Sequence, residues 1–291
     1  MVVKNLPACM TVAGSDSGGG AGIQADLKAF AYFKTHGTAA LTAVTAQNPH
    51  EVSAIAPIPV EVVIEQYRAI MSGIKISAIK TGMLFSADVV EALAIEMTQS
   101  ADQIPLVVDP VMVATSGAVL LQEDAIAAMK MQLIPLATVI TPNLPEAELL
   151  LGEAMERTED QAIQVAERLS KEFDVAVLIK GGHFDTGKSI DYLAAADHIY
   201  RIATPEVEAL TTHGTGCMLS SAIAANLALG KDPHSAIVAA KAYVYHCLSD
   251  CRRIGQKAYG MVSPKYCDES IVGVAMLLQH IMTNPPPGAE P

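Results

Sequence analysis

The segment His213–Ser220, His-Gly-Thr-Gly-Cys-Met-Leu-Ser, places glycines and a thiol where a mostly apolar run, 222–229, indicates a helix. The first N–H groups of a helix have no intrahelical acceptor, and the helix dipole favours negative charge there. Glycine also lets a phosphate approach the backbone closely. We therefore predict an anion site at this helix start, formed by Gly214, Thr215, Gly216 and Cys217.

Cys217 adds a chemical group to this anion site. A thiol at a helix N-terminus has its pKa lowered from about 8.5. We predict that Cys217 accepts the proton of a substrate hydroxyl as a phosphoryl group arrives. Taken alone, the segment also fits an ordinary helix cap with a buried small residue. Other segments of the chain must distinguish these two interpretations.

The elements that must position this site follow an alternating pattern of short β-rich runs and amphipathic stretches. Such a pattern predicts βαβ units and an α/β fold with a mainly parallel sheet covered by helices on both faces. The expected strands are 9–13, 39–46, 78–81, 106–109, 138–141 and 175–180, with 189–193 and 199–202 as an antiparallel appendage. The expected helices are 21–35, 60–72, 87–98, 123–133, 145–151, 158–171, 217–229 and 233–248.

Polar or glycine-rich groups follow nearly every expected strand. They are the glycine loop 14–22, Gln47, the segment 80–83, Asp109, the segment 143–146 and Lys180. Ligands of open α/β sheets bind beyond the carboxyl ends of the strands. We therefore expect these groups to share one ligand site, which packing alone does not explain.

Asn143 and Glu146 stand three residues apart at an expected helix start. Both can face a magnesium–phosphate group through water, since Mg²⁺ prefers oxygen ligands and keeps several waters. The alternative is ordinary capping, with Asn143 as N-cap and Glu146 reaching back to it.

The string Gly182-His-Phe-Asp-Thr-Gly-Lys188-Ser189 matches the phosphate-binding pattern Gly-x4-Gly-Lys-Ser. A true P-loop needs its lysine and serine to open a helix. Residues 189–193 instead indicate a strand after a turn, so we favour a chance match over a P-loop.

Composition limits the remaining possibilities. The chain has 291 residues and a net charge of −12 without a lysine or arginine block, so we expect neither nucleic acid nor membrane as a partner. It shows no signal peptide, no membrane-length apolar run, and five scattered cysteines that do not suggest a disulfide framework. We expect a cytoplasmic protein with one domain, 1–283, and a proline-rich disordered tail, 284–291.

Together these segments resemble the ribokinase-like superfamily, and within it the hydroxymethylpyrimidine and phosphomethylpyrimidine kinases of thiamine biosynthesis. The resemblance covers nearly the whole chain, to about residue 250. The resemblance rests on the segments 13–28, 45–48, 80–84, 108–112, 141–146, 180–183 and 212–217. It implies a three-layer fold, ATP and Mg²⁺ as cofactors, and a homodimer. Residues 255–264 depart from the family's usual glycine-rich ending, which leaves contacts of the C-terminal region open.

The resemblance also implies roles for individual residues. The implied pyrimidine pocket consists of Gly14, Ala21, Asp26, Gln47, Met83 and Val111. An amide such as that of Gln47 can both donate to and accept from an aminopyrimidine edge. Cys217 is then the base, Asn143 and Glu146 are the magnesium–phosphate anchor with Asp109 as a further candidate ligand, and Lys180 binds a nucleotide phosphate.

The expected activity is ATP-dependent phosphorylation of 4-amino-5-hydroxymethyl-2-methylpyrimidine and then of its monophosphate. A pyridoxal kinase is the nearest alternative, because both substrates are flat rings with a hydroxymethyl group. A non-catalytic pyrimidine sensor and a P-loop NTPase that uses Lys188 are the alternatives of other classes.

Overall fold

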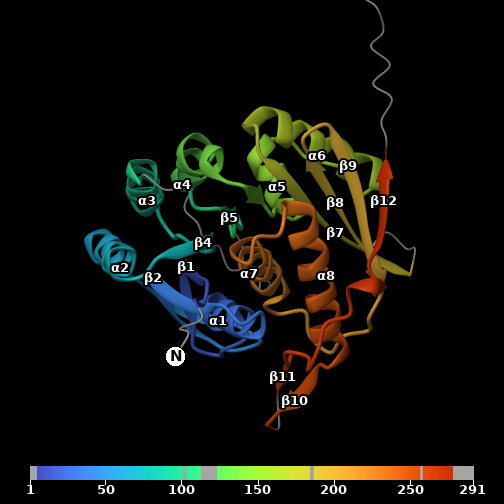
Figure 1. Cartoon of the computed structure of the whole chain (residues 1–291), viewed down its shortest axis with the longest axis horizontal. Coiled ribbons are helices and arrows are strands. Elements are labelled where there is room, and N and C mark those ends of the chain that lie inside the picture. The colour runs from blue at the N-terminus through green and yellow to red at the C-terminus, as the bar shows by residue number, and fades with distance from the viewer. Residues whose placement is uncertain (1–4, 101–102, 113–122, 184–186, 256–257, 278–291) are drawn as a thin grey trace, which may run out of the picture.

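A ten-stranded sheet forms the middle of the molecule (Figure 1), in the order β12-β9-β8-β7-β6-β5-β4-β1-β2-β3. The computed structural model describes residues 5–100, 103–112, 123–183, 187–255 and 258–277. The strands of this sheet are β1 Ala8–Asp16, β2 His36–Gln47, β3 Val52–Pro57, β4 Ile76–Thr81, β5 Leu106–Val108, β6 Val139–Ile140, β7 Ala176–His183, β8 Lys188–Ala195, β9 His198–Pro205 and β12 Gly273–Leu277. A separate pair consists of β10 Arg252–Ile254 and β11 Ala258–Gly260.

The six central strands, from β2 through β1, β4, β5 and β6 to β7, pair in parallel. The outer strands β3, β8, β9 and β12 pair antiparallel at the two edges. The predicted mainly parallel sheet is therefore confirmed, and so is the antiparallel appendage, which is β8 and β9.

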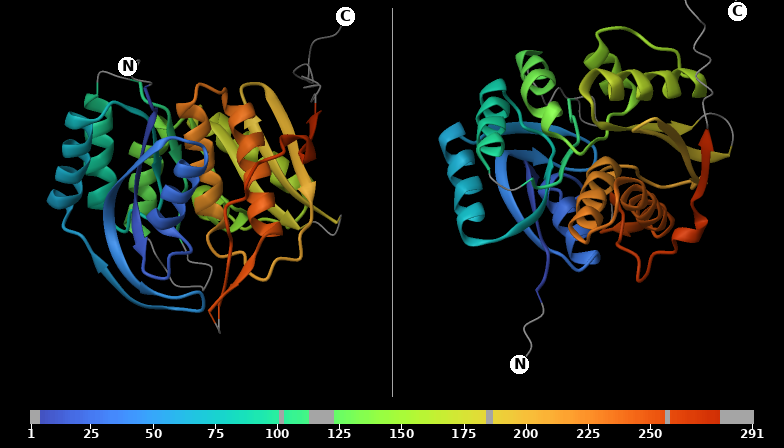
Figure 2. Two further views of the ribbon diagram at one scale, coloured as in Figure 1. Left: turned by 60° about the horizontal axis from the view of Figure 1, so that its bottom comes forward. Right: turned by 45° about the horizontal axis from the view of Figure 1, so that its top comes forward.

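Helices cover both faces of the sheet (Figures 1 and 2). They are α1 Gly22–Tyr32, α2 Val60–Gly73, α3 Ala87–Gln99, α4 Glu123–Ala128, α5 Leu144–Leu151, α6 Glu159–Phe173, α7 Thr215–Ala228 and α8 Pro233–Ser249. Successive strand residues point to opposite faces and enter different cores. Val107 packs in the core under α1, α7 and α8, whereas Val108 packs in the core under α2 to α6.

Helix α7 lies against the sheet and between α1 and α8, and it brings the thiol segment to the site. Its residues from Met218 to Leu227 are all buried. A helix that is mostly apolar all round is stable when protein surrounds it. This packing fixes the position of α7, whose first turn lines the cavity at the carboxyl ends of the strands.

Some elements differ from the sequence prediction. The expected helix 123–133 consists of α4 followed by one π-helical turn, Met129–Leu133, because Pro135 cannot continue a regular helix. Strands β3 and β12 were not expected from the sequence, since both are edge strands with mostly exposed residues. The predicted domain end at residue 283 and the tail 284–291 lie outside the described residues. No described helix has the length and apolar character needed to cross a membrane.

The structure also shows whether the Gly-x4-Gly-Lys-Ser string is a P-loop or part of a hairpin. Lys188 and Ser189 are the first residues of β8, which pairs antiparallel with β7. The hairpin prediction is confirmed, although residues 184–186 of its turn lie outside the described residues. Lys188 and Ser189 open a strand and not a helix, so the described part of the string lacks the helix N-terminus that a P-loop requires.

Candidate active site

The candidate site lies at the point where the order of strands across the sheet reverses. Strand β1 has β2 on one side and β4 on the other, and such a switch point opens a crevice at the carboxyl ends of the strands. A cavity of about 300 Å³ occupies this position. Its lining includes nearly every residue that the sequence predicted, namely Gly14, Ala21, Gln47, Met83, Asp109, Val111, Asn143, Glu146, Lys180, Gly214, Thr215, Gly216 and Cys217.

The glycine loop packs directly against the start of α7. Gly214, the N-cap of α7, has φ +89°, and a Cβ there would lie 1.9 Å from the carbonyl oxygen of Gly20. Gly22 has φ +56°, and its Cβ would lie 2.4 Å from the carbonyl oxygen of Gly14. Only glycine tolerates both that backbone conformation and that approach.

The anion site at the start of α7 is smaller than predicted. The N–H of Thr215 donates to the carbonyl of Thr212 at 3.2 Å and is not available to a ligand. Among the described residues, the N–H groups of Gly216 and Cys217 make no backbone hydrogen bond. The same holds for the N–H of Gly214, the N-cap residue. These three amides, at the positive end of a buried helix, are the donors left for an anion.

The thiol of Cys217 has a different pKa from the predicted one. Burial raises the pKa of Cys217 to about 11, and the nearby charge of Lys80 opposes that rise only in part. The prediction of a lowered pKa is therefore wrong for this structure. The helix N-terminus was visible in the sequence, but the desolvation of the thiol by the surrounding protein was not.

Lys180 on β7 holds a cluster of carboxylates. Its Nζ lies 2.9 Å from Asp109 Oδ1 and 3.5 Å from Glu146 Oε2. Thr141 and Ser220 also donate hydrogen bonds to Asp109, each at 3.1 Å. A Cβ at Gly216 would lie 3.5 Å from Lys180 Nζ, so this ammonium stands beside the free amides of α7.

The electrostatics of this cluster favour a charged lysine. Burial disfavours its charge, but Asp109 and Glu146 outweigh burial and raise the pKa of Lys180. Burial would likewise raise the pKa of Asp109, yet Lys180 and Lys80 hold it below its usual value. The pKa of Glu146 is raised by burial and by Asp109, against the effect of Lys180.

Asn143 and Glu146 form the capping box that the sequence left as the alternative reading. Asn143 Oδ1 accepts the N–H of Glu146, and Glu146 Oε2 accepts the N–H of Asn143, both at 2.8 Å. The box caps α5 and also places Glu146 in the cavity beside Lys180. Within the described residues, no group of three or more His, Cys, Asp or Glu side chains is arranged to hold a metal ion.

Asp26 requires a correction, because it lies behind the cavity and not in its lining. Its carboxylate accepts hydrogen bonds from Lys80 Nζ, 2.9 Å from both oxygens, and from Thr11 Oγ1 at 2.6 Å. Ser221 of α7 donates a further short hydrogen bond. Asp26 and Lys80 are both fully buried, so this pair ties α1, the sheet and α7 together beneath the site.

Replacing Asp26 by asparagine is expected to lower the free energy of unfolding by about 3–5 kcal/mol, because Lys80 would remain buried without its counter-charge. Chemical denaturation measures this change. The matched control is Lys231→Met, which removes an exposed pair with Glu269 and should cost less than about 1 kcal/mol. Equal losses in the two variants would contradict a structural role for the buried pair.

The apolar wall of the cavity comes from Met83 and Val111. Met83 packs in a small cluster with Ala43, Ile55 and Val111. A Cβ at Gly14 would lie 2.4 Å from Met83 Cε, so glycine at this position leaves room for the methionine side chain. A flat ring fits such a wall, and Gln47 lines the same cavity.

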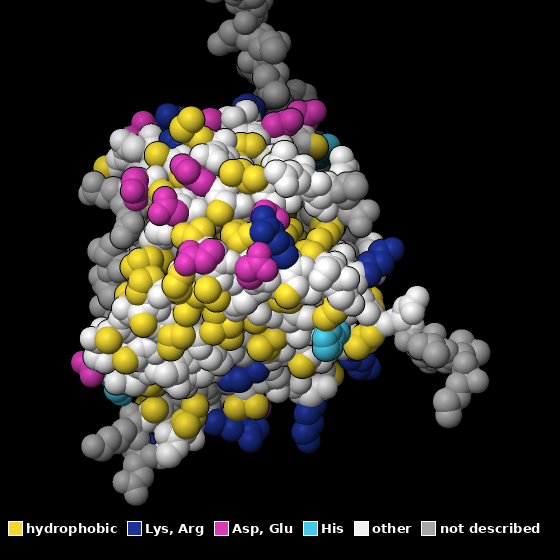
Figure 3. Space-filling view, turned by 90° about the vertical axis from the view of Figure 1, so that its left-hand side faces the viewer, with side chains coloured by type: hydrophobic (Ala, Val, Ile, Leu, Met, Phe, Trp, Pro, Cys, Tyr) yellow, Lys and Arg dark blue, Asp and Glu magenta, His cyan; other side chains and the backbone are white. Residues whose placement is uncertain are grey.

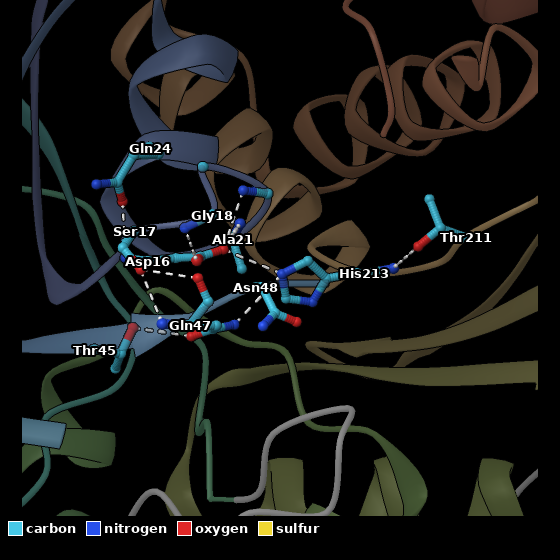
Figure 4. Close-up of polar contacts among 12 residues, drawn as sticks. Asp16, Ser17, Gly18, Ala21, Gln24, Thr45, Gln47, Asn48, Thr211 and His213 are labelled. Atoms are coloured by element: carbon cyan, nitrogen blue, oxygen red, sulfur yellow. Dashed lines mark hydrogen bonds and ion pairs between the residues drawn. The ribbon is translucent and has the colours of Figure 1, made fainter. Parts of the chain in front are cut away.

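Two lining residues, Asp16 and His213, were left out of the predicted site (Figure 4). His213 Nε2 lies 3.1 Å from Asp16 Oδ2 and 3.4 Å from Gln47 Nε2. In the sequence, Asp16 fits a turn and His213 fits a structural histidine. The two residues are 197 positions apart in the sequence, so no local pattern indicates their contact.

A second cavity, of about 220 Å³, adjoins the first. The two cavities share Lys180, Thr212, Thr215 and Gly216. Within the second cavity, Lys241 Nζ lies 2.8 Å from Asp191 Oδ2 and 3.0 Å from Ser189 Oγ. No described residue after Leu248 lines either cavity, so the divergent segment 255–264 makes no described contact there.

The sheet with its two helical layers is the ribokinase-like fold of small-molecule kinases. A pyridoxal kinase from Staphylococcus aureus, solved with ADP and with AMP-PCP plus pyridoxal, matches this chain with a TM-score of 0.83. The two are 32% identical, and the match covers 94% of this chain and 100% of that one.

Sequence comparisons define the family more narrowly. The family model described as phosphomethylpyrimidine kinase matches residues 16–262. A hydroxymethylpyrimidine/phosphomethylpyrimidine kinase from Rhizobium meliloti is 42% identical over 245 residues, 84% of this chain and 91% of that relative. A thiamine biosynthesis bifunctional protein from Geobacter sulfurreducens is 43% identical over 247 residues, 85% of this chain and 50% of its own length. This chain belongs to the phosphomethylpyrimidine kinase family.

Proposed function

We propose that this protein transfers the γ-phosphoryl group of ATP to 4-amino-5-hydroxymethyl-2-methylpyrimidine, and then a second phosphoryl group to the monophosphate, in thiamine biosynthesis. The observation that carries the proposal is the joining of two cavities at one anion site. One cavity combines an apolar wall with the amide of Gln47, and both cavities include Lys180 and Gly216. In this proposal the second cavity takes the nucleotide.

The pyrimidine ring lies against Met83 and Val111 in this proposal, with its polar edge on Gln47. Its hydroxymethyl group then points to the start of α7. The triphosphate spans the shared residues, where Lys180 and the amides of Gly216 and Cys217 neutralise the charge of the transferred group. Phosphoryl transfer depends mainly on such positioning and charge neutralisation.

Magnesium fits the acidic side of the cavity through water and phosphate oxygens. Glu146, Asn143 and Asp109 line the cavity, but Lys180 already contacts both carboxylates. These oxygens would hold a hydrated ion, as Mg²⁺ commonly keeps several waters and binds substrate phosphates. When bound, the ion would neutralise phosphate charge.

In the first transfer, the substrate hydroxyl oxygen bonds to the γ-phosphorus, the bond to ADP breaks, and the hydroxyl proton has to leave. Cys217 is the base that we propose for this proton, and only its thiolate can accept it. In the second transfer the acceptor is a phosphate oxygen, whose second pKa is about 6. That oxygen is already ionised at neutral pH, so this step needs no strong base.

The test is mass spectrometry of products from purified protein supplied with ATP, Mg²⁺ and one of three substrates: the hydroxymethylpyrimidine, its monophosphate or pyridoxal. Monophosphate and diphosphate products support the proposal. Turnover of pyridoxal alone would assign the protein to vitamin B6 salvage. Tight pyrimidine binding without any product would favour a sensor.

Pyridoxal remains the second candidate substrate because of one observation. The pyridoxal kinase described above shares the fold over nearly the whole chain. A flat pyridine ring with a hydroxymethyl group suits the same apolar wall. We expect pyridoxal to be phosphorylated more slowly than the pyrimidine, if both are substrates.

Replacing Lys188 by alanine is expected to change kcat and the KM for ATP by less than about twofold. Lys188 is exposed at the start of β8 and lines neither cavity. Steady-state kinetics with varied ATP check this. A loss of a hundredfold or more would revive the P-loop interpretation.

We further infer a cytoplasmic homodimer. The face in Figure 3, which includes α2 and β2, carries many hydrophobic side chains. On the exposed side of the edge ribbon, Val44 pairs with Ala56 and Ala46 pairs with Ala54, and Val62 of α2 is 46% exposed. An uncharged, exposed edge such as this suits burial against a second copy. Sedimentation equilibrium of wild type and Val44→Asp tests it, since a dimer at this face should dissociate in the variant.

A further inference from the structure

The ammonium of Lys80 lies in a closed position in the wall of the first cavity. Lys80 on β4 is 0% exposed, and it belongs to the cavity lining together with Cys217. A Cβ at Gly82 would lie only 2.9 Å from Lys80 Nζ, so glycine at that position leaves the room that the ammonium fills. Packing of this kind keeps the positive charge in one place.

Asp26 anchors this ammonium without using all of its donors. Lys80 Nζ lies 2.9 Å from each carboxylate oxygen of Asp26. An ammonium has three N–H groups. The described residues offer Lys80 Nζ no hydrogen bond beyond these two. One N–H is therefore left for a further acceptor.

Helix α7 brings Cys217 to this buried pair. Ser221 Oγ donates a short hydrogen bond to Asp26 Oδ1 and lies 2.7 Å from the carbonyl oxygen of Cys217. Residues four apart in a helix are neighbours on one face. The thiol of Cys217 thus shares a helix face with the hydroxyl that contacts Asp26.

Several elements contribute charged groups that interact electrostatically with the thiol. They are Asp26 of α1, Lys80 of β4, Asp109 after β5 and Lys180 of β7. Burial has the largest effect on the pKa of Cys217 and raises it. Lys80 has the next largest effect and lowers that pKa, ahead of the opposing charges of Asp26 and Asp109. Lys80 is therefore the strongest electrostatic support that a thiolate finds here.

The remaining charged groups of the cavity have partners of their own. His213 Nε2 lies 3.1 Å from Asp16 Oδ2, and Glu146 Oε2 lies 3.5 Å from Lys180 Nζ. Burial would lower the pKa of Lys80, but Asp26, followed by Cys217 and Asp109, raises it. Lys80 thus stays charged at neutral pH.

We propose that Lys80 is a positioning residue for the proposed base: its remaining N–H faces the sulfur of Cys217 and stabilises the thiolate that accepts the hydroxyl proton in the first transfer. The inference rests on the proposed function. Asp26 keeps the ammonium charged and in place. When the proton passes from the substrate oxygen to the sulfur, Cys217 becomes a neutral thiol and Lys80 keeps Asp26 as its partner.

This role differs from that of Lys180, whose charge serves both transfers. In Lys80→Met, kcat/KM for the hydroxymethylpyrimidine should fall by about ten- to a hundredfold, because a nearby opposite charge shifts a pKa by about one to three units. The value for the monophosphate should change by less than about threefold, since that acceptor is already ionised. Equal losses for both acceptors would place Lys80 on the phosphate and overturn the proposal.

Alkylation of Cys217 tests the same contact without any turnover. Iodoacetamide is uncharged and reacts with the thiolate, so its rate at Cys217 reports the thiolate share. Mass spectrometry of the peptide that contains Cys217 separates this rate from that of the other cysteines. At about pH 8, Lys80→Met should slow the alkylation by about ten- to a hundredfold. A rate as fast as in wild type, or faster, would contradict the contact.

Two variants separate this effect from stability. Lys80→Met leaves Asp26 buried alone, whereas the double variant Lys80→Met, Asp26→Asn removes both charges and should regain stability. Alkylation should stay slow in the double variant, and a return to the wild-type rate would show that Lys80 acts only through stability.

Lys241→Met is the matched control for the loss of a buried ion pair. It breaks the pair with Asp191, whose Oδ2 lies 2.8 Å from Lys241 Nζ. Only alkylation is compared in this variant, because Lys241 lines the second cavity. Its rate at Cys217 should equal that of wild type, and an equally slow rate would trace the effect to lost stability.

The two proposals fail in different ways. If wild type phosphorylates neither the hydroxymethylpyrimidine nor its monophosphate, the proposed function is wrong, and the alkylation rates decide the role of Lys80 by themselves. If wild type phosphorylates both, but Lys80→Met keeps the alkylation rate and the first transfer, the positioning role is wrong and the proposed function stands.

Discussion

Replacing Lys180 by methionine is expected to lower kcat for both phosphoryl transfers by about a hundred- to a thousandfold. Its ammonium is the cation beside the free amides of α7, it is held there by Asp109 at 2.9 Å, and it lines both cavities. Because both transfers move the same charged group, kcat should fall by a similar factor for both. Steady-state product formation with each acceptor, at saturating ATP and Mg²⁺, measures the loss.

Stability has to be separated from chemistry in this variant. Removing Lys180 leaves Asp109 and Glu146 buried without their cation, which should cost about 3–5 kcal/mol of unfolding free energy. The double variant Lys180→Met, Asp109→Asn removes one of those charges and should regain part of that stability without regaining activity. Lys188→Met, with the same change of charge on the neighbouring strand, should keep both. An active, merely less stable Lys180→Met protein would contradict the phosphate role.

Much of the site was predictable because parallel strands bring their carboxyl ends to one edge. Gln47, Asp109 and Lys180 each follow or end a strand whose apolar run is clear in the sequence, so a single argument places them together. The hairpin at Lys188 was predictable for a similar reason, since the residues after it have strand character. These predictions need only the order of elements.

Predictions that need the register of one element against another fared worse. Asp26 lies in α1, and only the packed structure shows that its side chain faces Lys80 and Thr11 under the sheet instead of the cavity. The contact of Asp16 with His213 requires two loops to touch through Gly20 and Gly214. No local pattern records such a contact between distant segments.

The pKa of Cys217 shows the same limit for electrostatics. The position at a helix N-terminus is a local feature and predicts a lower pKa, whereas desolvation depends on everything that packs around the thiol. In this site desolvation is the larger effect. The thiol is therefore protonated at neutral pH, and that state has a measurable consequence.

For the first transfer, kcat/KM for the hydroxymethylpyrimidine should rise with pH between about 7 and 9, close to tenfold per unit. The pKa of Cys217 is raised to about 11, so the thiolate is the minor form below that pH and its share grows tenfold with each unit. A thiol with an unperturbed pKa of about 8.5 would level off within this range. The pH dependence of kcat/KM reports the free enzyme, which is the state that the structure describes.

For the second transfer the same range should be nearly flat, because the acceptor phosphate is ionised well below pH 7. Cys217→Ala should then lower the first transfer by about a hundredfold or more and the second by less than about tenfold. It should also abolish the pH dependence of the first. The monophosphate reaction in the same protein is the internal control for folding and for ATP binding. A flat profile for both acceptors, with the first transfer intact in Cys217→Ala, would show that the hydroxyl proton leaves by another route.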